Sequence, residues 1–396
     1  MAMHSYEYLV VGGGMTGDAV TQGIRQHDET GTIGLVGEES HAPYKRPPLT
    51  KGLWSGGDEA KIWRKTDERG VALHLGRRIV SLDLANRRAV DDVDDEYAYE
   101  KLVLATGGTP RRLGDDDDSG VVYYRTLDDY RHVRALADRG ASFVVIGGGF
   151  IGSEIAASLR SNGCEVTMAF PESGIGWRNF PPELSAAVTE EYRNRGVEVL
   201  TDVLVAGVER EGERTRVRLE DGRTLEAVAV VAGLGIVPRT DLAEAAGLPV
   251  EDGIVVDEQG RVAGFDGVFA AGDVARFPLV DLRRSGRVEH EDHALSHGKL
   301  VGANAAGAGA RYEQLPFFYS DLFDFGYEAV GEVNSRHRTV EAWKDPNRKG
   351  VVAFVDDDGR PRGVLLWGIF DKVDDARALI GAGEPVDEAK LRELAG

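Results

Sequence analysis

The fold of this chain is decided by residues 8–17, which read YLVVGGGMTG. The first four residues predict a buried parallel strand, and the glycines after them predict a tight turn into a helix. Gly12 permits the turn, Gly14 lets a pyrophosphate approach the backbone, and Gly17 lets the helix pack on the strand. The helix N-terminus favours negative charge. The stretch predicts a dinucleotide-binding turn, although a single fingerprint also fits a glycine turn without a ligand.

A second copy of this pattern makes the ligand-free interpretation weaker. Residues 143–154 read FVVIGGGFIGSE, so a buried strand again runs into a glycine turn formed by Gly147, Gly149 and Gly152. Two such units in one chain indicate an internal duplication. Two dinucleotide sites imply FAD together with a nicotinamide cofactor.

An acid after the second strand of each unit is the expected ligand of a ribose diol. In the first unit this acid is Glu38, with Glu39 as the alternative. In the second unit it is displaced by two residues to Glu172, and no arginine stands directly beside it to hold a 2′-phosphate. NADH is therefore favoured over NADPH, while the nearby Arg178 keeps NADPH open.

The length and charge of the chain narrow its class. With 396 residues it should form two or three domains. Its formal net charge of −20 argues against nucleic acid and anionic membranes as partners. No apolar run reaches the roughly 18 residues of a membrane span, and the short segment before the first strand predicts a cytoplasmic protein. We expect the acidic runs 91–96, 115–118 and 356–358 to be solvated loops, as would suit a high-salt cytoplasm.

Cys164 is the only cysteine of the chain. A single cysteine cannot form an intramolecular disulfide, so internal disulfide reductase chemistry is excluded. Because Cys164 falls between an expected helix and the next strand, we expect it to have a packing role.

Residues 42–54, APYKRPPLTKGLW, carry a specific family resemblance. Together with the first glycine turn, they resemble the two-dinucleotide flavoproteins that include ferredoxin and rubredoxin reductases, monodehydroascorbate reductase and apoptosis-inducing factor. The resemblance implies that this loop wraps FAD, with Arg46 at the pyrophosphate and Lys51 beside the isoalloxazine. Thr50 stands where the family has serine.

Three further segments match the remaining FAD motifs of that family. Residues 99–111 imply contacts to FAD from Ala105, Thr106 and Gly107. Residues 229–238, with Gly235, return the chain to the first domain, and residues 267–275 imply that Asp273 accepts a ribityl hydroxyl.

The resemblance also assigns residues near the reacting atoms. Taken alone, Glu154 is an acid early in a helix, where the dipole favours it. By resemblance it pairs with Lys51, and Phe150 is a gate between flavin and nicotinamide, with plain core packing as the alternative for Phe150. Removing one member of a dry Lys51–Glu154 pair would cost about 3–5 kcal/mol.

Residues 287–297, RVEHEDHALSH, allow two interpretations. Histidines at positions 290, 293 and 297 share a helix face, as metal ligands could. The resemblance favours the other interpretation, in which Glu289 and His290 approach the nicotinamide and His293 packs or forms a hydrogen bond. No metal is expected.

The last part of the chain resembles the small α+β C-terminal domain of the family. Strand-like segments at 328–333, 339–343, 351–355 and 364–367 precede a closing helix. In residues 316–321, PFFYSD, Tyr319 stands where the family usually has Trp, so the aromatic wall keeps one ring fewer.

The predicted fold is α/β, with two Rossmann-like dinucleotide-binding domains and a small α+β domain. The FAD domain comprises residues 1–112 and 238–308, the NAD domain 113–237, and the C-terminal domain 309–396.

The expected function is that of an FAD-dependent NADH:acceptor oxidoreductase, in which hydride passes from NADH to flavin N5 and electrons then pass to a second acceptor. That acceptor is a small iron–sulfur protein of ferredoxin type, a quinone or oxygen. Arg283, Arg284 and Arg287 could form a positive rim for a ferredoxin. The alternative is a redox sensor resembling apoptosis-inducing factor, in which a long-lived charge-transfer complex with NADH replaces turnover. A homodimer is also open.

Overall fold

The computed structural model describes residues 2–114 and 120–396, so the predicted acidic loop at 115–118 lies outside the described residues. The contacts divide the chain into two compact units. We call unit 1 the segments up to residue 45, 59–109 and 237–316, and unit 2 the segments 46–58, 110–236 and 317–396. The predicted division into three domains stays a prediction.

Unit 1 is built on one mixed sheet of seven strands. Its parallel part follows from the apolar runs, because Val10 of the first strand pairs with Leu35 on one side and Val103 on the other. The remaining two strands are antiparallel and lie at one end of the sheet. The strands are β3 (Val71–Leu75), β2 (Ile33–Gly37), β1 (Met3–Val11), β6 (Glu96–Leu104), β5 (Arg88–Asp91) and β4 (Ile79–Asp83), in this order, with β18 (Val268–Ala270) beside β6.

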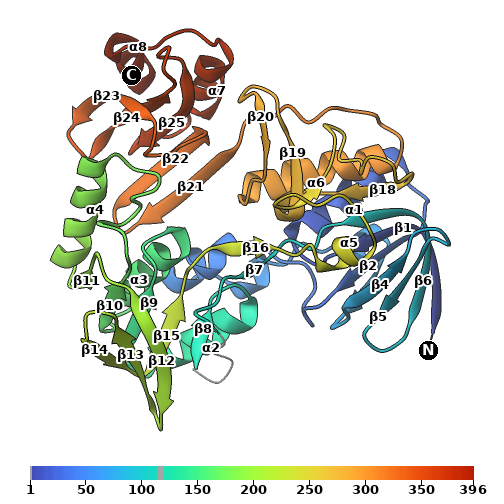
Figure 1. Cartoon of the computed structure of the whole chain (residues 1–396), viewed down its shortest axis with the longest axis horizontal. Coiled ribbons are helices and arrows are strands. Elements are labelled where there is room, and N and C mark those ends of the chain that lie inside the picture. Colours follow the sequence, from blue (N-terminus) through green and yellow to red (C-terminus); the bar gives the residue numbers. More distant parts are fainter. Residues whose placement is uncertain (1, 115–119) are drawn as a thin grey trace. The chain divides into compact units, whose positions relative to one another are not determined.

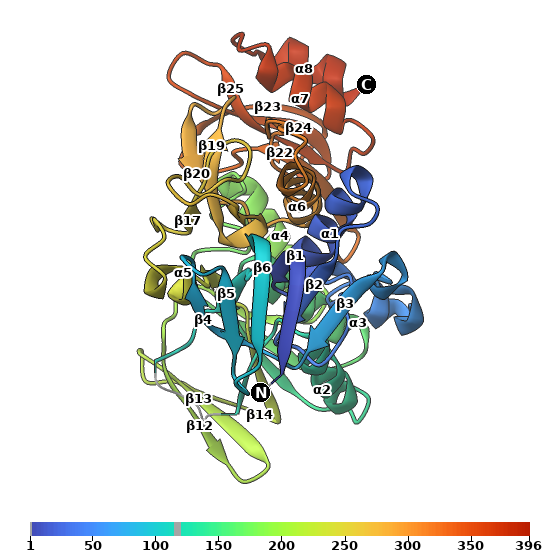
Figure 2. The same cartoon turned by 90° about the vertical axis from the view of Figure 1, so that its right-hand side faces the viewer.

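Two helices of unit 1 lie side by side in both views, α1 (Met15–His27) and α6 (Glu291–Ala305) (Figures 1 and 2). Glycines permit their close approach. A Cβ on Gly23 would lie 1.9 Å from the Lys299 carbonyl oxygen, and one on Gly302 would lie 2.0 Å from the Val20 carbonyl oxygen. The two backbones therefore touch directly, and any side chain at either glycine would separate the helices.

Short elements complete unit 1. The prediction of a solvated loop at residues 91–96 is wrong for Asp91, which is fully buried and accepts hydrogen bonds from the Tyr97 hydroxyl and from backbone N–H groups of the turn. The short elements are η3 (Glu59–Lys61), η4 (Asp67–Arg69), α5 (Asp241–Ala245), η5 (Gly272–Val274) and the three-stranded sheet of β17 (Ile254–Val255), β19 (Ala275–Leu279) and β20 (Arg284–Gly286).

The first half of unit 2 is a five-stranded parallel sheet with helices and an antiparallel meander. Sheet order is β11 (Glu198–Leu200), β10 (Val166–Ala169), β9 (Phe143–Ile146), β15 (Ala229–Ala232) and β8 (Val121–Tyr123). The helices are α2 (Leu127–Ala137), α3 (Phe150–Ser161) and α4 (Pro182–Asn194), and the meander is β12 (Val205–Glu211), β13 (Arg214–Leu219) and β14 (Thr224–Ala227). Cys164 lies buried between α3 and β10, and burial raises the pKa of its thiol. This agrees with a packing role.

The second half of unit 2 is an antiparallel sheet of five strands, with two helices packed against it (Figure 1). The sequence predicted four strands and one helix here, and it missed the edge strand β21, whose alternating burial is clear only in the structure. The order is β21 (Phe317–Leu322), β22 (Phe325–Gly331), β25 (Pro361–Trp367), β24 (Lys349–Val355) and β23 (Arg338–Asp345), and the helices are α7 (Val373–Gly381) and α8 (Glu388–Ala395). The predicted solvated loop at residues 356–358 is confirmed, because these residues lie in a turn between strands and Asp357 and Asp358 are exposed.

The chain leaves unit 1 through β7 (Gly108–Pro110) and returns through β16 (Ile236–Pro238). The segment 46–58 of unit 2 holds η1 (Pro47–Leu49) and η2 (Gly52–Ser55). The predicted α/β class is confirmed by the parallel sheets of both units. Among the described residues, no helix combines the length and apolar character needed to cross a bilayer.

Candidate functional site

The first glycine turn has the geometry of a phosphate cradle. Gly12 has φ +131°, and a Cβ there would lie 2.0 Å from the Ala105 carbonyl oxygen. A Cβ on Gly17 would lie 1.9 Å from the Gly12 carbonyl oxygen. Gly14 caps α1 without any side-chain hydrogen bond, so the helix N-terminus keeps its attraction for an anion. Glycine is required at the turn, and the turn fits a pyrophosphate.

Ala105, Thr106 and Gly107 follow β6 in the same unit. Ala105 is buried against the glycine turn, and the Thr106 hydroxyl donates to the Arg239 carbonyl oxygen at 2.9 Å. Gly107 has φ +65°. The structure thus brings this segment next to Gly12, as convergence of FAD motifs requires.

The second glycine turn repeats this geometry in unit 2. Gly147 has φ +113°, and its Cβ would lie 2.5 Å from the Gly233 carbonyl oxygen. A Cβ on Gly152 would lie 2.0 Å from the Gly147 carbonyl oxygen. Gly149 is exposed, caps α3 without a side-chain hydrogen bond, and has open space where a Cβ would stand. Room for a dinucleotide phosphate is therefore present here too.

The two predicted ribose acids both carry an ion-paired arginine. Glu38, exposed after β2, pairs with Arg239 of the same unit. Glu172, partly buried after β10, lies 3.0 Å from the Arg178 guanidinium. Gly235 is exposed with φ +82°, and its carbonyl oxygen accepts from the Arg111 backbone N–H at 2.9 Å.

The predicted pair between Lys51 and Glu154 is confirmed as a contact. Lys51 Nζ lies 2.6 Å from Glu154 Oε1, and the two side chains are 16% and 5% exposed. Lys51 lies between the two short helices η1 and η2, and Glu154 lies in the second turn of α3. The chain therefore builds a nearly dry cation–carboxylate pair from segments a hundred residues apart.

Sequence reasoning missed two hydroxyl groups that complete this pair. The Thr50 hydroxyl donates to Glu154 Oε2 at 2.6 Å, and the Ser320 hydroxyl donates to Glu154 Oε1. Both residues are buried. Thr50 was noted only as a replacement for serine, and the shared hydroxyl was the signal for its role. Ser320 gave no local signal, because only the paired strands β21 and β22 place it beside α3.

Aromatic rings surround the pair within unit 2. Phe150 meets Phe318 edge to face, with ring centroids 5.2 Å apart. The Lys51 ammonium lies 5.6 Å from the centre of the Tyr319 ring, which is half exposed. Arg46 donates to the Arg125 carbonyl oxygen at 2.8 Å. Phe150 contacts a core ring at one face, so packing and gating are compatible roles.

Arg287 does not belong to a positive rim, and this corrects the sequence prediction. Its side chain is 9% exposed and lies 2.7 Å from Glu289 and 3.2 Å from Asp252. Its guanidinium also donates to the Asp273 carbonyl oxygen at 2.8 Å. Arg287 therefore binds Glu289 and the backbone at Asp273 and does not face solvent, whereas Arg283 and Arg284 are exposed.

The histidines of α6 form an aromatic cluster. His293 stacks on Phe277 and on His297, and its Nδ1 lies 3.1 Å from the Tyr312 hydroxyl. This confirms the predicted packing and hydrogen-bonding role of His293. Burial lowers the pKa of His293 to about 3. Burial also lowers the pKa of His290, the N-cap residue of α6, to about 4, although the negative charge of Asp273 acts in the opposite direction. The rings are therefore neutral near pH 7.

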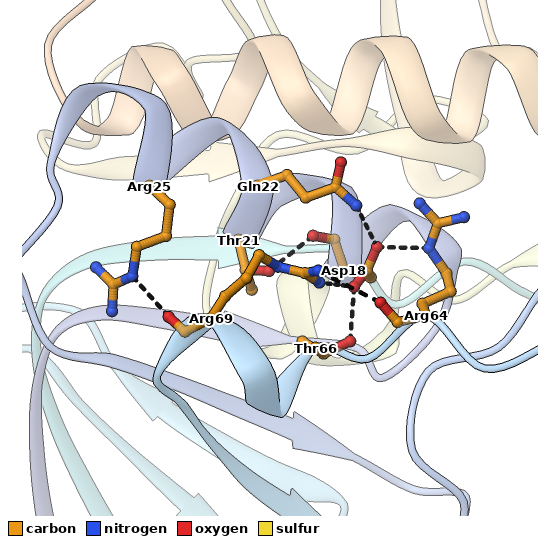
Figure 3. Close-up of polar contacts among 7 residues, drawn as sticks. All are labelled: Asp18, Thr21, Gln22, Arg25, Arg64, Thr66 and Arg69. Carbon is orange, nitrogen blue, oxygen red and sulfur yellow. Dashed lines mark hydrogen bonds and ion pairs between the residues drawn. The ribbon is translucent and has the colours of Figure 1, made fainter.

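Asp18 forms a buried charge cluster that the sequence did not reveal. It is fully buried in α1 and forms ion pairs with Arg64 and Arg69, while Thr66 and Gln22 donate to it at 2.6 and 2.7 Å (Figure 3). The arginines come from the segment around η4. The cluster ties this segment to the helix that follows the first glycine turn.

These features define a class of protein. Two glycine turns of the same geometry, each followed by a predicted ribose acid, together with a nearly dry lysine–glutamate pair, are typical of an oxidoreductase that uses two dinucleotides. The residues present fit FAD and a pyridine nucleotide, because both turns hold glycines whose Cβ would strike a backbone carbonyl oxygen, which keeps the turns tight, and the space beside Gly149 is open.

Comparison with known proteins gives the family. Residues 6–298 match the family model described as pyridine nucleotide-disulphide oxidoreductase. The chain belongs to this family and is a flavoprotein oxidoreductase that uses FAD and NAD(H). Its single cysteine separates it from those members whose chemistry needs a cysteine pair.

Similar proteins cover almost the whole chain. A ferredoxin–NAD(+) reductase component of the anthranilate 1,2-dioxygenase system of Burkholderia cepacia is 33% identical over 99% of this chain and 98% of its own. Apoptosis-inducing factor 1 of Dictyostelium discoideum is 32% identical over 96% of this chain and 79% of its own. The solved covalent putidaredoxin reductase–putidaredoxin complex contains a chain that matches with a TM-score of 0.90 and 28% identity, over 100% of this chain and 96% of that one.

Proposed function

We propose that the chain reduces a small iron–sulfur protein of ferredoxin type at the expense of NADH. The Lys51–Glu154 pair carries this proposal, because its location in a nearly dry site fits a charge that serves a redox group better than one that serves stability. The full-length similarity to a reductase named for ferredoxin and NAD(+) supports the choice of partners.

Residue roles follow from the chemistry. When bound, FAD supplies a hydride acceptor at N5 and releases its electrons singly or as a pair. We propose that Gly12, Gly14, Gly17, Glu38, Arg46 and Asp273 hold it, and that Gly147, Gly149, Gly152 and Glu172 hold the nucleotide. Lys51 presents its cation where negative charge develops, and Glu154 fixes the orientation of the ammonium.

Glu289 and His290 are proposed to orient the nicotinamide. Arg287 keeps Glu289 in place through the 2.7 Å contact. His290 stays neutral, since burial lowers its pKa to about 4, so it can accept or donate a hydrogen bond without adding a charge. Phe150 is proposed to swing between the ring of Phe318 and the incoming nicotinamide.

NADH is the proposed nucleotide, with NADPH as a weaker substrate. Glu172 suits a ribose diol and repels a 2′-phosphate. Arg178 partly cancels that repulsion through its 3.0 Å contact with Glu172, and the Arg178 side chain is 82% exposed. An exposed pair of this kind is worth at most about 1 kcal/mol, so the arginine is available to a phosphate at low cost.

The deciding experiment is anaerobic reduction of the holoprotein by one equivalent of NADH, followed by addition of a purified [2Fe–2S] ferredoxin or of air. Rapid reoxidation by ferredoxin supports the proposal. Rapid reoxidation by air alone would assign an oxidase, and the absence of reduction by NADH would contradict the proposal altogether.

A surface test identifies the acceptor side. Arg283 and Arg284 are exposed on and beside β20 and remain the only residues of the predicted rim. Their replacement by Glu should slow reduction of ferredoxin and weaken its salt dependence, while reduction by NADH stays unchanged. A ferredoxin rate equal to that of the parent would remove this rim from the docking surface.

A redox sensor is the second candidate, favoured by the similarity to apoptosis-inducing factor over 96% of the chain. In that case the reduced, nucleotide-bound form should persist for minutes with both acceptors, with a stable long-wavelength absorption band. Sedimentation before and after NADH would then show whether the predicted homodimer forms. The cytoplasmic location stays a prediction.

A further inference from the structure

The carboxylate of Glu154 is held by three donors that come from two separate segments of unit 2. Oε1 receives Lys51 Nζ and the Ser320 hydroxyl, and Oε2 receives the Thr50 hydroxyl. Ser320 lies on the edge strand β21, 166 residues from Glu154. The antiparallel sheet therefore contributes one of the three donors to the charged pair.

The hydroxyl of Ser320 is itself held in place. Tyr327, its cross-strand partner on β22, forms a hydrogen bond with it and is 1% exposed. Burial and the charge of Glu154 raise the pKa of Tyr327 well above its usual value, so the phenol remains a protonated donor. A line of donors runs from Tyr327 through Ser320 to Glu154.

Because the site is buried, each hydrogen-bond donor contributes to stabilising the charge of Glu154. Ser320 is 1% exposed and Glu154 5%, so water does not replace a lost hydrogen bond. A buried carboxylate that loses a donor keeps its full charge with less compensation. The negative potential felt by Lys51 and by any group beside it then grows.

We propose that Ser320 is a positioning residue of the redox site, which makes the C-terminal antiparallel sheet a working part of flavin reduction. Ser320 holds Glu154 so that its charge is balanced by Lys51, Thr50 and Ser320 together. This inference rests on the proposed function, since it concerns the flavin that Lys51 serves.

The test compares two variants of the holoprotein. Ser320→Ala removes the donor, and Thr215→Val removes a buried hydroxyl of the same unit that has no hydrogen-bond partner among the described residues. With Ser320→Ala, we expect reduction by NADH to slow roughly tenfold, as for a lost hydrogen bond to a charged group, and the flavin midpoint potential to become more negative. Thr215→Val should match the parent in both.

The sign of the shift in midpoint potential separates this role from a structural one, because water admitted by a loosened sheet would screen the charge of Glu154 and would not make the potential more negative. A parent-like rate and potential in Ser320→Ala overturns the inference. Should that variant lose FAD, Ser320→Cys decides in its place, since the thiol fills the volume but is a weak donor. An intermediate rate is then expected, and a parent-like one overturns the inference.

Failure of the proposed function would look different. If the parent itself is not reduced by NADH, the proposed function fails. If the parent is reduced but both Ser320 variants behave like it, only the role of Ser320 fails.

Discussion

The two glycine turns share one backbone and differ in where the buried acid stands. In both, a Cβ at the third glycine would strike the carbonyl oxygen of the first, at 1.9 Å for Gly17 and 2.0 Å for Gly152. After the third glycine the first turn continues with Asp18, which pairs with two arginines, and the second with Ser153 and then Glu154, which pairs with Lys51.

A shift of one helical position changes what the acid does. A residue one place further along a helix points about 100° around its axis, so it reaches a different neighbour. In the first turn the acid, Asp18, joins α1 to the segment around η4 through two arginines. In the second turn the acid, Glu154, forms an ion pair with Lys51 of the proposed flavin loop. The two units therefore share the geometry of the glycine turn, and their buried acids have different partners.

The largest expected effects come from adding a Cβ to the third glycine of each turn, one variant at a time, which tests whether the two turns bind different ligands. Gly17→Ala should abolish FAD binding, because the new Cβ cannot coexist with the Gly12 carbonyl oxygen. Gly152→Ala should keep FAD and lose at least tenfold in NADH affinity, on the order of 1.4 kcal/mol. Flavin absorbance after purification and NADH titration measure the two outcomes.

Gly381→Ala is the matched control for these variants, since nothing lies within 4 Å of its would-be Cβ. The distinction between the turns breaks down if both variants lose FAD, or if both retain FAD and NADH affinity.

The buried acid of the first turn should act on stability. Asp18→Asn leaves Arg64 and Arg69 without a countercharge in a buried cluster, and should lower the free energy of unfolding by about 3–5 kcal/mol. The exposed pair of Asp128 and Arg131 provides the control, because Asp128→Asn should cost less than about 1 kcal/mol. Urea unfolding measures both, and equal losses would show that the Asp18 cluster is not the anchor.

The acid of the second turn should act on the chemistry as well as on stability. Glu154→Ala should retain FAD and slow its reduction by NADH roughly tenfold or more, because Lys51 loses its partner and its orientation. Anaerobic stopped-flow absorbance gives the rate. Reduction kinetics like those of the parent would remove Glu154 from the site.

Low pH should reduce the stability of unit 1 through His290, the N-cap residue of α6, and His293 within that helix. Their folded pKa values, about 4 for His290 and about 3 for His293, lie below the value of about 6.5 for unfolded chains, so the unfolded chain binds more protons between these pH values. Stability conferred by the neutral rings is complete above pH 6.5 and is lost as the pH falls toward 4.

The variant His293→Phe tests this. It keeps a ring against Phe277, loses the contact with Tyr312 at all pH values, and should reduce the loss of stability between pH 6.5 and 4.5. Urea midpoints across this range measure the slope, and an unchanged slope would exclude His293 as a source of acid sensitivity.

The smallest expected effect concerns Arg178, which forms an ion pair with the proposed ribose acid Glu172. Arg178→Ala should lower kcat/KM for NADPH by at most about fivefold and leave that for NADH nearly unchanged, because the pair with Glu172 is exposed. Steady-state kinetics with both nucleotides measure it. A larger loss with NADH than with NADPH would reverse the proposed preference.

Much of the architecture was readable from local patterns. The glycine spacing predicted both turns, whereas the pairing of Lys51 with Glu154 was predicted only by the resemblance to a known family. Ser320 and the arginines around Asp18 were out of reach, because each meets its partner through strand pairing or a loop whose path the sequence does not encode locally. Arg287 was misassigned for the same reason, since a cluster of arginines says nothing about which of them is buried.

The glycine contact between α1 and α6 also has a consequence during synthesis. Gly23 needs the backbone at Lys299, and translation at about 5–20 residues per second separates these positions by an interval on the order of tens of seconds. Throughout that interval the core-facing side of α1 lacks its cover, while residues 110–236 of unit 2 emerge in between. The early chain therefore exposes the apolar side chains of α1 that α6 covers, such as Val20 and Ile24, until the second helix arrives.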